Sequence, residues 1–332
     1  MTRLLIYGPS YRRIEAEVAA AAPGMDVLIM DEAGIIRLDG TEIALDAAAP
    51  NLAWANHEVF LSPAARNFFV TLLKAESLAW VQSAAAGFDN PAFGELVRKG
   101  AKLSTSHGQA IGMADYVMAG VLDHFQRGPE RRAAQNAQVW WREGFREVSG
   151  TNWLIIGYGA IGQGVAQRAQ AFGAKVVGVR RDSNASPFAE RIVDLSALSE
   201  ELPRADVVVL SIPLNARTRH IADAAFFRAM KAGSVLVNVG RGGLVDEAAL
   251  LAALDAGLPE HAVLDVFETE PLPVDSPFWD HPRVSVTGHC SGVTGGENRR
   301  NQALFLDNLA RFANGTPLLN VADPKDVFAA RD

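Results

Sequence analysis

The sequence predicts an α/β fold with two Rossmann-like, doubly wound parallel-sheet domains. Three observations predict it. The 332 residues exceed what one compact core usually organises. Short runs rich in Val, Ile and Leu alternate with longer helical patterns, as parallel strands joined by crossover helices require. This alternation occurs twice, and a glycine-bounded break at 108–112 separates the two series.

The first series predicts a parallel sheet covered by helices. A helix rich in Glu and Ala follows its first strand, and another helical stretch separates its last two strands. The strands are expected at Leu4–Tyr7, Val27–Met30, Leu52–Trp54 and Leu78–Gln82.

The second series follows a helix expected from Met113 to Arg127 and a polar, charged stretch that runs to Ser149. Its strand-like runs are short and β-branched, which is typical of parallel strands covered on both faces. Six are expected, the number in a full doubly wound sheet. They are Trp153–Ile156, Lys175–Val179, Val207–Ile212, Ser234–Val239, Ala262–Val266 and Val284–Thr287.

Composition narrows the classes of partner and compartment. The formal net charge of -7 argues against nucleic acid or an anionic membrane as the main partner. The single cysteine, Cys290, can form neither an internal disulfide nor a Cys-rich metal site, so we expect no metal and a reducing, cytoplasmic setting. The first residues lack the pattern of a signal peptide, and no apolar run approaches the roughly 18 residues of a membrane span.

A glycine-rich turn after the first strand of the second series is the strongest local motif. The G-x-G-x-x-G pattern has Gly157 for a tight turn, Gly159 for close approach of the backbone to a pyrophosphate, and Gly162 for helix–strand packing. Ala160 and Ile161 would open the helix, whose free N–H groups favour phosphates. A glycine-rich turn without a ligand is the alternative, which the flanking strand and helix disfavour.

The next strand ends in Arg180-Arg181, which bears on the cofactor. An NAD site usually places a carboxylate here for the ribose hydroxyls, whereas guanidinium groups bind a 2′-phosphate. The pair therefore favours NADP over NAD. In the alternative, both arginines are solvated and Asp182 is the ribose ligand.

Three residue types needed to reduce a 2-oxo acid follow successive strands of this series. Histidine can transfer the proton, and His289 is the candidate. A carboxylate on the other ring nitrogen would orient the imidazole, and Glu270 is the candidate. Arginine can grip the substrate carboxylate, and Arg241 is the candidate. Each alone could be an ordinary turn or surface residue, but their order at successive strand ends favours a site.

The chain resembles the D-isomer-specific 2-hydroxyacid dehydrogenase family, which includes glyoxylate/hydroxypyruvate reductases. The first hundred residues resemble it mainly at 83–89. The stretches that carry the resemblance are Gly157–Gly162, Pro213–Thr218, Asn238–Gly243, Asp265–Pro271 and His289.

The resemblance implies the site residues. Arg241, Glu270 and His289 would be the catalytic trio, and Ala86 and Gly87 would offer N–H groups to the substrate carboxylate. Asp265 would lie beside the nicotinamide, with Val239 and Gly240 lining its carboxamide. Further cofactor contacts would come from Ile212, Pro213 and Thr218, together with Arg241 and His289.

The resemblance also implies the organisation. Residues 1–107 plus 290–332 would form a flavodoxin-like substrate-binding domain, and 108–289 an inserted NAD(P)-binding Rossmann domain. The active site would lie in the inter-domain cleft, which should close on the ligand. A homodimer is expected, with the helix from Met113 and the Trp140-Trp141 pair as interface. The alternative for the tryptophans is core packing.

The sequence departs from the family pattern without losing a catalytic side chain. Ala85 replaces a glycine of the substrate loop, and Asp115 replaces a glutamate. Gly288 replaces the proline before His289, which leaves the backbone path there open. Cys290 replaces an aliphatic residue.

The expected function is hydride transfer between NADP, or NAD, and a small 2-oxo/2-hydroxy acid such as glyoxylate or hydroxypyruvate. A formate dehydrogenase would pair its histidine with glutamine, which Glu270 contradicts. The L-lactate type places its glycine motif at the N-terminus, and short-chain dehydrogenases need a Tyr-x-x-x-Lys pair that this sequence lacks. The alternative left open is a non-catalytic, NAD(P)H-sensing protein like the co-repressors that resemble this family.

Overall fold

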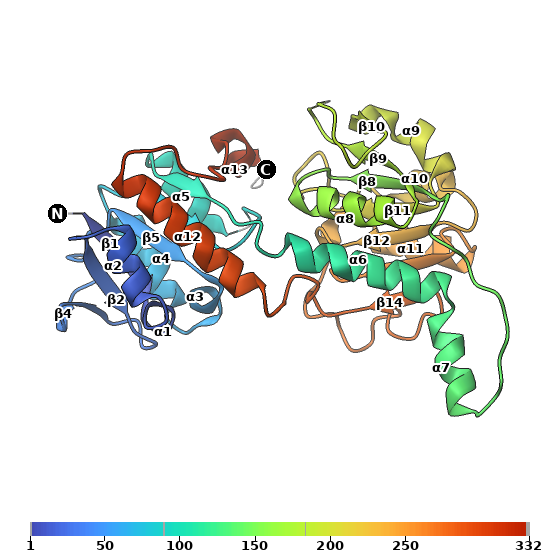
Figure 1. The fold of residues 1–332 in the computed structure, drawn as a ribbon, viewed down its shortest axis with the longest axis horizontal. Coiled ribbons are helices and arrows are strands. Elements are labelled where there is room, and N and C mark those ends of the chain that lie inside the picture. Colours follow the sequence, from blue (N-terminus) through green and yellow to red (C-terminus); the bar gives the residue numbers. More distant parts are fainter. Residues whose placement is uncertain (1, 89, 183, 330–332) are drawn as a thin grey trace. The chain divides into compact units, whose positions relative to one another are not determined.

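A computed structural model describes residues 2–88, 90–182 and 184–329. The chain divides into two compact units (Figure 1). Unit 1 comprises Met1–Gly108 and Gly295–Asp332, and unit 2 comprises Gln109–Thr294. Unit 2 is therefore inserted between the two pieces of unit 1.

Unit 1 contains a seven-stranded sheet with the order β4-β3-β2-β1-β5-β6-β7. The order β2-β1-β5-β6-β7 is parallel and is that of flavodoxin-like sheets, which confirms the predicted fold class. The strands are β1 Arg3–Tyr7, β2 Asp26–Met30, β3 Ile36–Leu38, β4 Thr41–Ile43, β5 Leu52–Ala55, β6 Trp80–Ser83 and β7 Lys102–Ser104.

The prediction of a purely parallel first sheet was incomplete, because β3 and β4 form an antiparallel hairpin on β2. Asp39 and Gly40 link the two strands with φ of 49° and 79°. Two successive residues with positive φ are typical of a type I′ turn, for which Asp-Gly is a preferred sequence. β7 was not predicted either.

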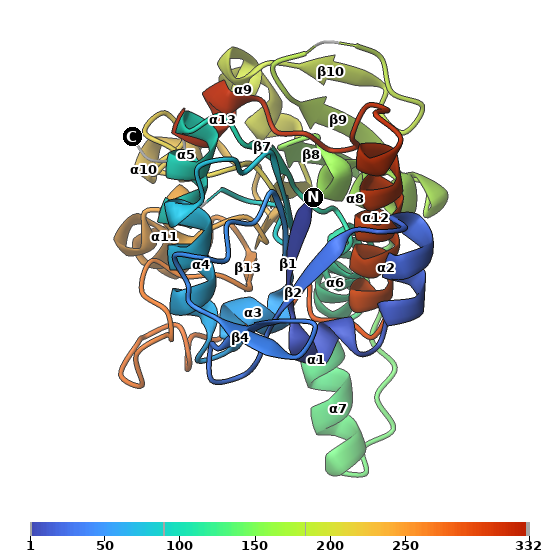
Figure 2. The same cartoon turned by 90° about the vertical axis from the view of Figure 1, so that its left-hand side faces the viewer.

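Helices cover both faces of this sheet (Figure 2). On one face α2 and α12 pack on the strands, and the Trp54 ring stacks on Phe305 at 4.5 Å between centroids. On the other face α3, α4 and α5 bury Phe68 and Phe93. The helices are α1 Gly8–Tyr11, α2 Glu15–Ala21, α3 His57–Leu61, α4 Ala65–Lys74, α5 Pro91–Arg98, α12 Glu297–Ala313 and α13 Pro324–Ala329.

Unit 2 contains a parallel seven-stranded sheet with the order β10-β9-β8-β11-β12-β13-β14, which is Rossmann-like with one added strand. All six predicted strands are present, and the short β10 was missed. The strands are β8 Asn152–Ile156, β9 Lys175–Val179, β10 Arg191–Val193, β11 Val207–Leu210, β12 Val235–Asn238, β13 His261–Leu264 and β14 Val284–Val286.

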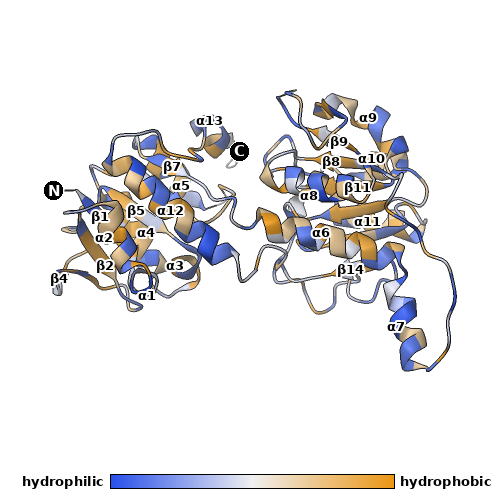
Figure 3. Cartoon of the chain, viewed as in Figure 1, coloured by the Kyte–Doolittle hydropathy of each residue, from blue (hydrophilic) through white to orange (hydrophobic). Residues whose placement is uncertain are grey.

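Alternate residues of these strands face opposite helical layers, and the central strands are apolar (Figure 3). Trp153 and Ile155 pack with α6 and α8, whereas Leu154 and Ile156 pack with α10 and α11. The helices are α6 Ala110–Phe125, α7 Gly128–Asn136, α8 Ala160–Ala171, α9 Leu198–Glu201, α10 Ala224–Ala229 and α11 Glu247–Asp255.

The polar stretch expected between 128 and 149 contains a helix, α7, which the prediction missed. Its residues are hydrophilic, so no apolar period marked it, although Pro129 at its start and several good helix formers favour a helix. After α7, residues 137–147 form an extended arm (Figure 1). Trp140 on this arm is 90% exposed, so the core-packing interpretation was wrong for this residue.

No described helix combines the length and the apolar character that crossing a membrane requires. Among the described residues, no group of three or more His, Cys, Asp or Glu side chains is arranged to hold a metal ion.

Candidate active site

The glycine-rich turn joins β8 to α8 in unit 2. Gly157 has φ of 101°, and a Cβ at this position would lie 2.4 Å from the Ile212 backbone nitrogen. Only glycine tolerates both the left-handed conformation and this close approach. A Cβ on Gly162 would lie 2.3 Å from the Gly157 carbonyl oxygen, so α8 packs directly on the turn.

The start of α8 fits a phosphate group. Gly159 is the N-cap and provides no side-chain cap, and nothing lies within 4 Å of the position that its Cβ would occupy. The helix continues through Ala160 and Ile161 to Ala171, long enough for a helix dipole. The backbone N–H groups of its first turn and the open space at Gly159 suit a pyrophosphate.

The end of β9 carries the two arginines. The Arg180 guanidinium lies 5.7 Å from the centre of the Tyr158 ring, and its Nε donates to the Asp182 carbonyl at 2.6 Å. Asp182 uses its own carboxylate to accept the Asn184 N–H at 3.0 Å. Arg181 is exposed beside it. Arg180 therefore braces this loop by donating to the carbonyls of Asp182 and Asn184, and the Asp182 carboxylate accepts from the loop's own backbone.

The loop after β11 holds the next predicted contacts. Ile212 is partly buried and Pro213 is exposed. Thr218 is buried, and its hydroxyl donates to the Pro213 carbonyl at 2.7 Å and accepts the Asn215 N–H at 2.9 Å. Thr218 thus shapes the loop from within.

The loop after β12 carries Arg241. Val239 is buried, and the Gly240 N–H donates to the Asn238 side chain at 3.0 Å. The Asn238 amide in turn donates to the Arg241 carbonyl at 3.0 Å, and the Arg241 guanidinium donates to the Gly240 carbonyl at 2.7 Å. The backbone on both sides of Arg241 is therefore fixed by Asn238.

The loops after β12 and β13 are in direct backbone contact. A Cβ on Gly242 would lie 1.8 Å from the Phe267 carbonyl carbon and 2.3 Å from the Glu268 nitrogen. Only glycine allows this approach. Because Gly242 follows Arg241 and Phe267 precedes Glu270 by three residues, the contact brings these two loops together.

Glu270 and His289 form a pair at this edge of the sheet. The His289 Nδ1–H donates to Glu270 Oε2 at 2.7 Å, and Glu270 Oε1 accepts the Phe267 N–H at 3.0 Å. Among the residues that the structure describes, none forms a hydrogen bond with the second ring nitrogen of His289, whose side chain is 50% exposed. An imidazole held by a carboxylate, with its other nitrogen open, is the arrangement of a general acid or base.

Asp265 lies under the histidine turn and is fully buried. Its carboxylate accepts the Thr287 hydroxyl at 2.6 Å, the Cys290 N–H at 2.9 Å and the Ser291 N–H at 3.0 Å. Burial alone would raise the pKa of Asp265, but the hydrogen bonds from Ser291 and Thr287 lower it below its usual value. Asp265 is therefore an ionised anchor for the residues around His289.

Ala86 and Gly87 lie after β6 in unit 1 and are partly buried. Within the described ranges, the backbone N–H groups of these two residues have no hydrogen-bond partner. Asp89, which closes the predicted stretch 83–89, lies outside the described residues.

Comparison with known proteins supplies the family. The sequence model for the D-isomer specific 2-hydroxyacid dehydrogenase, NAD binding domain, matches residues 118–291. The D-3-phosphoglycerate dehydrogenase of Bacillus subtilis is 33% identical over 264 residues, which cover 77% of this chain and 50% of that protein. A glyoxylate/hydroxypyruvate reductase B of Klebsiella pneumoniae is 36% identical over 227 residues, covering 64% and 68%.

A solved structure agrees over nearly the whole chain. It is the NADPH-dependent glyoxylate/hydroxypyruvate reductase of Sinorhizobium meliloti in complex with NADP and sulfate, with a TM-score of 0.77, 28% identity and coverage of 98% and 100%. The chain belongs to the D-isomer-specific 2-hydroxyacid dehydrogenase family. This confirms the predicted family. The chain spans about half the length of the phosphoglycerate dehydrogenases that it matches.

This family member carries a second His–Glu pair that the sequence analysis missed. His220 Nε2 lies 2.5 Å from Glu268 Oε1, and His220 adopts a positive φ of 51°. The Glu268 N–H donates to Glu247 at 2.8 Å, and burial, followed by the charge of Glu268, raises the pKa of Glu247. Glu268 is exposed but paired with His220. These contacts join the loops after β11 and β13.

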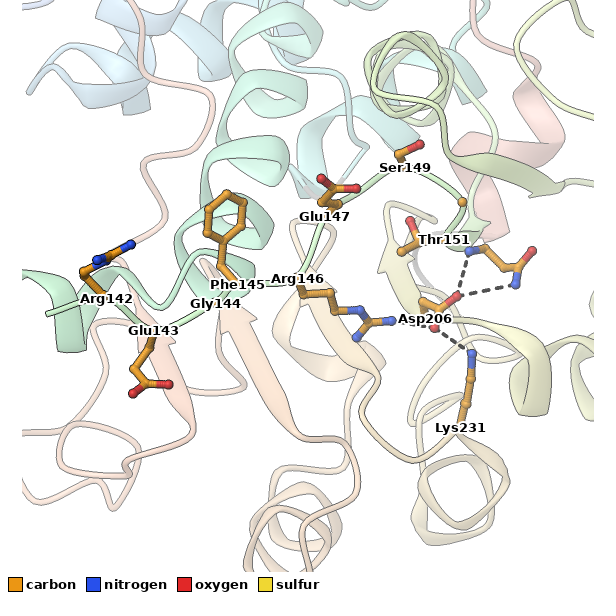
Figure 4. A pocket seen from close by; sticks show the side chains of 12 residues that line it. Arg142, Glu143, Gly144, Phe145, Arg146, Glu147, Ser149, Thr151, Asp206 and Lys231 are labelled. Carbon is orange, nitrogen blue, oxygen red and sulfur yellow. Dashed lines mark hydrogen bonds and ion pairs between the residues drawn. The ribbon is translucent and has the colours of Figure 1, made fainter.

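A separate polar cluster lies at the opposite, amino edge of the same sheet (Figure 4). Buried Asp206 accepts Arg146 at 2.5 Å, Lys231 at 2.7 Å and the Asn152 N–H at 2.8 Å. Arg146 also lies 4.4 Å from the centre of the Phe125 ring. The cluster anchors the end of the arm. It lies at the edge of the sheet opposite to His289.

Proposed function

We propose that this chain reduces a small 2-oxo acid, such as glyoxylate or hydroxypyruvate, with NADPH, and that NADH is the less favoured cofactor. The observation that carries the proposal is the His289–Glu270 hydrogen bond of 2.7 Å. His289 follows β14 and Glu270 follows β13, so the bond lies at the carboxyl edge of the sheet that also carries the Gly157 turn. Ligands of open α/β sheets bind at this edge.

Each residue has a distinct role in the proposed reaction. His289 gives a proton to the carbonyl oxygen as that oxygen becomes a hydroxyl, and Glu270 orients the ring and balances the charge of the imidazolium. Arg241 binds the substrate carboxylate and polarises the carbonyl. The N–H groups of Ala86 and Gly87 in unit 1 are suited to bind a carboxylate.

The residues of unit 2 fit a nicotinamide dinucleotide, which supplies the hydride when bound. Gly157, Gly159 and Gly162 with the start of α8 would hold the pyrophosphate, as the open space at Gly159 supports. The nicotinamide would lie near Val239, Gly240 and Asp265. The part of the cofactor between the pyrophosphate and the nicotinamide would be bordered by Ile212, Pro213 and Thr218. These assignments rest on their places at successive strand ends.

The preference for NADPH rests on Arg180 and Arg181. Both lie after β9, where the 2′ substituent of the adenosine ribose binds in such folds. Both oxygens of the Asp182 carboxylate accept from Asn184, so this carboxylate is engaged within its own loop. The Sinorhizobium meliloti reductase with its bound NADP supports the same preference.

Turnover tests the proposal and separates it from a non-catalytic sensor. Purified protein is given NADPH with glyoxylate, hydroxypyruvate or phenylpyruvate, and absorbance at the nicotinamide band is followed. We expect oxidation of NADPH with at least one of these acids, and a loss of about 10²–10⁴-fold in kcat for His289→Ala. Binding of NADPH without turnover of any acid would favour the sensor, and a fully active His289→Ala variant would refute the assignment.

We also propose that the arm, residues 137–147, packs against a second copy of the chain. Trp140 is 90% exposed, Val139 57% and Phe145 54%. Apolar side chains gathered on an anchored, projecting segment are typical of an interface. A homodimer is the form that would cover them.

A further inference from the structure

Asp265 fixes the turn that carries His289 through hydrogen bonds to residues before and after the histidine. The Asp265 carbonyl accepts the His289 N–H at 2.7 Å, while the Asp265 carboxylate accepts Thr287, Cys290 and Ser291. His289 itself has φ of 50°. A non-glycine residue in this region is strained and persists only where its neighbours fix it.

Gly288 adds no stiffness to this turn. Nothing lies within 4 Å of the position that a Cβ on Gly288 would occupy. The conformation of His289 therefore depends on Asp265 and on whatever fixes the Thr287 hydroxyl.

That hydroxyl is fixed from α6. The Tyr116 hydroxyl lies 2.7 Å from Thr287 Oγ1. An ionised carboxylate only accepts, so Thr287 gives its one proton to Asp265 and must accept from Tyr116. Burial raises the pKa of Tyr116 to about 12, so the phenol keeps its proton at neutral pH. The relay runs from Tyr116 through Thr287 to Asp265.

The same face of α6 holds the rest of the segment. A Cβ on Gly112 would lie 2.3 Å from Thr294 Cγ2, and a Cβ on Gly292 would lie 3.1 Å from the Gln109 side-chain oxygen. Residues 109, 112 and 116 share one face of a helix. The whole segment 287–294 thus packs against α6.

We propose that Tyr116 is a positioning residue for His289, acting through Thr287 and Asp265. The inference rests on the proposed function, in which His289 transfers the proton. Tyr116 touches no reacting atom. Its hydroxyl restrains Thr287, Thr287 restrains the Asp265 carboxylate, and this carboxylate holds the backbone that follows His289.

The first test is Tyr116→Phe, which removes one oxygen. We expect kcat to fall about three- to ten-fold, the usual effect of one hydrogen bond, with KM and NADPH affinity within about two-fold of wild type. Thr287→Val should lower kcat similarly, and the double variant should lose little more than either single one. Thr287→Ser keeps the hydroxyl and should restore most of the rate. Tyr11→Phe, the same change in unit 1, should leave kcat unaltered.

The single cysteine gives a readout that is independent of turnover. Cys290 is exposed and follows His289, so the rate at which a disulfide reagent labels its thiol reports on the order of the turn. We expect at least three-fold faster labelling in Tyr116→Phe than in wild type or Tyr11→Phe, and faster amide exchange at Cys290 and Ser291.

The outcomes separate the two proposals. An unchanged labelling rate in Tyr116→Phe, or fully additive losses in the double variant, overturns the positioning role. If wild type reduces no 2-oxo acid, the proposed function fails, while faster labelling in Tyr116→Phe still supports the coupling of Tyr116 to the turn.

Discussion

Replacing Glu270 with glutamine tests the central contact of the site. Glutamine has nearly the same shape and can keep the bond from Phe267 N–H to its side-chain oxygen. It loses the negative charge that faces His289 Nδ1 at 2.7 Å. The change therefore removes charge and orientation from the imidazole while leaving the surrounding loop intact.

The structure gives different magnitudes for stability and for rate. The side chains of His289 and Glu270 are 50% and 35% exposed, and exposed ion pairs contribute about 0.2–1 kcal/mol to folding. We therefore expect a change in the free energy of unfolding below about 1 kcal/mol. In the reaction the imidazole changes charge, and a charged hydrogen bond is worth about 1.5–3 kcal/mol, so kcat should fall about ten- to a hundred-fold.

Stopped-flow measurement of NADPH oxidation gives kcat, and urea unfolding gives the stability. Glu268→Gln is the matched control, because it removes the same charge from the neighbouring His220–Glu268 pair. Glu268 lies two positions before Glu270 in the sequence. We expect the control to change kcat less than three-fold. Equal losses in the two variants, or a Glu270→Gln enzyme with unchanged kcat, would refute the assigned role.

Three further outcomes are expected. Arg180→Asp should lower the ratio of kcat/KM for NADPH to that for NADH by at least about ten-fold, since a carboxylate repels a 2′-phosphate; a constant ratio refutes this role. Trp140→Ser should shift the protein from dimer to monomer in light scattering at micromolar concentration, and a monomeric wild type contradicts the interface. Asp206→Asn should lower the free energy of unfolding by about 2–3 kcal/mol at pH 7, because two cations lose their buried partner. Burial acts to raise the pKa of Asp206, but the hydrogen bonds from Asn152 and Lys231 lower it overall. The contribution of Asp206 to the free energy of unfolding is therefore complete above its unfolded pKa and is lost as the pH falls below about 4. A stability difference between Asp206→Asn and wild type that stays constant down to about pH 3 contradicts this.

The strands of both sheets were predictable where burial fixes their composition. Residues 153–156 and 207–210 lie at the centre of a covered sheet, so every position is apolar and the run is unmistakable. The β3–β4 hairpin lies at an edge and is half polar, so only its Asp-Gly turn marked it. Helix α7 has no buried face, so it left no period in the sequence.

The meeting of Glu270 and His289 at one edge of the sheet was predictable, because parallel strands bring their carboxyl ends to one edge. That topology alone places the loops that hold Glu270 and His289 on neighbouring strands β13 and β14. The contacts that fix these loops were not predictable. Tyr116 and Thr287 are 171 positions apart, and their contact depends on how α6 lies on the sheet. His220 meets Glu268 only through a positive φ that no residue pattern indicates.

Two carboxylates of one loop illustrate how environment assigns roles. Asp265 is fully buried and its oxygens accept Thr287, Cys290 and Ser291, so protonation would weaken the hydrogen bonds that hold the turn. Glu270 accepts one backbone N–H and reserves its second oxygen for His289. The first carboxylate is therefore suited to hold geometry and the second to respond to charge on the imidazole. A site that moves a proton at His289 needs both, because the ring must be free to change charge while its backbone stays in a strained conformation.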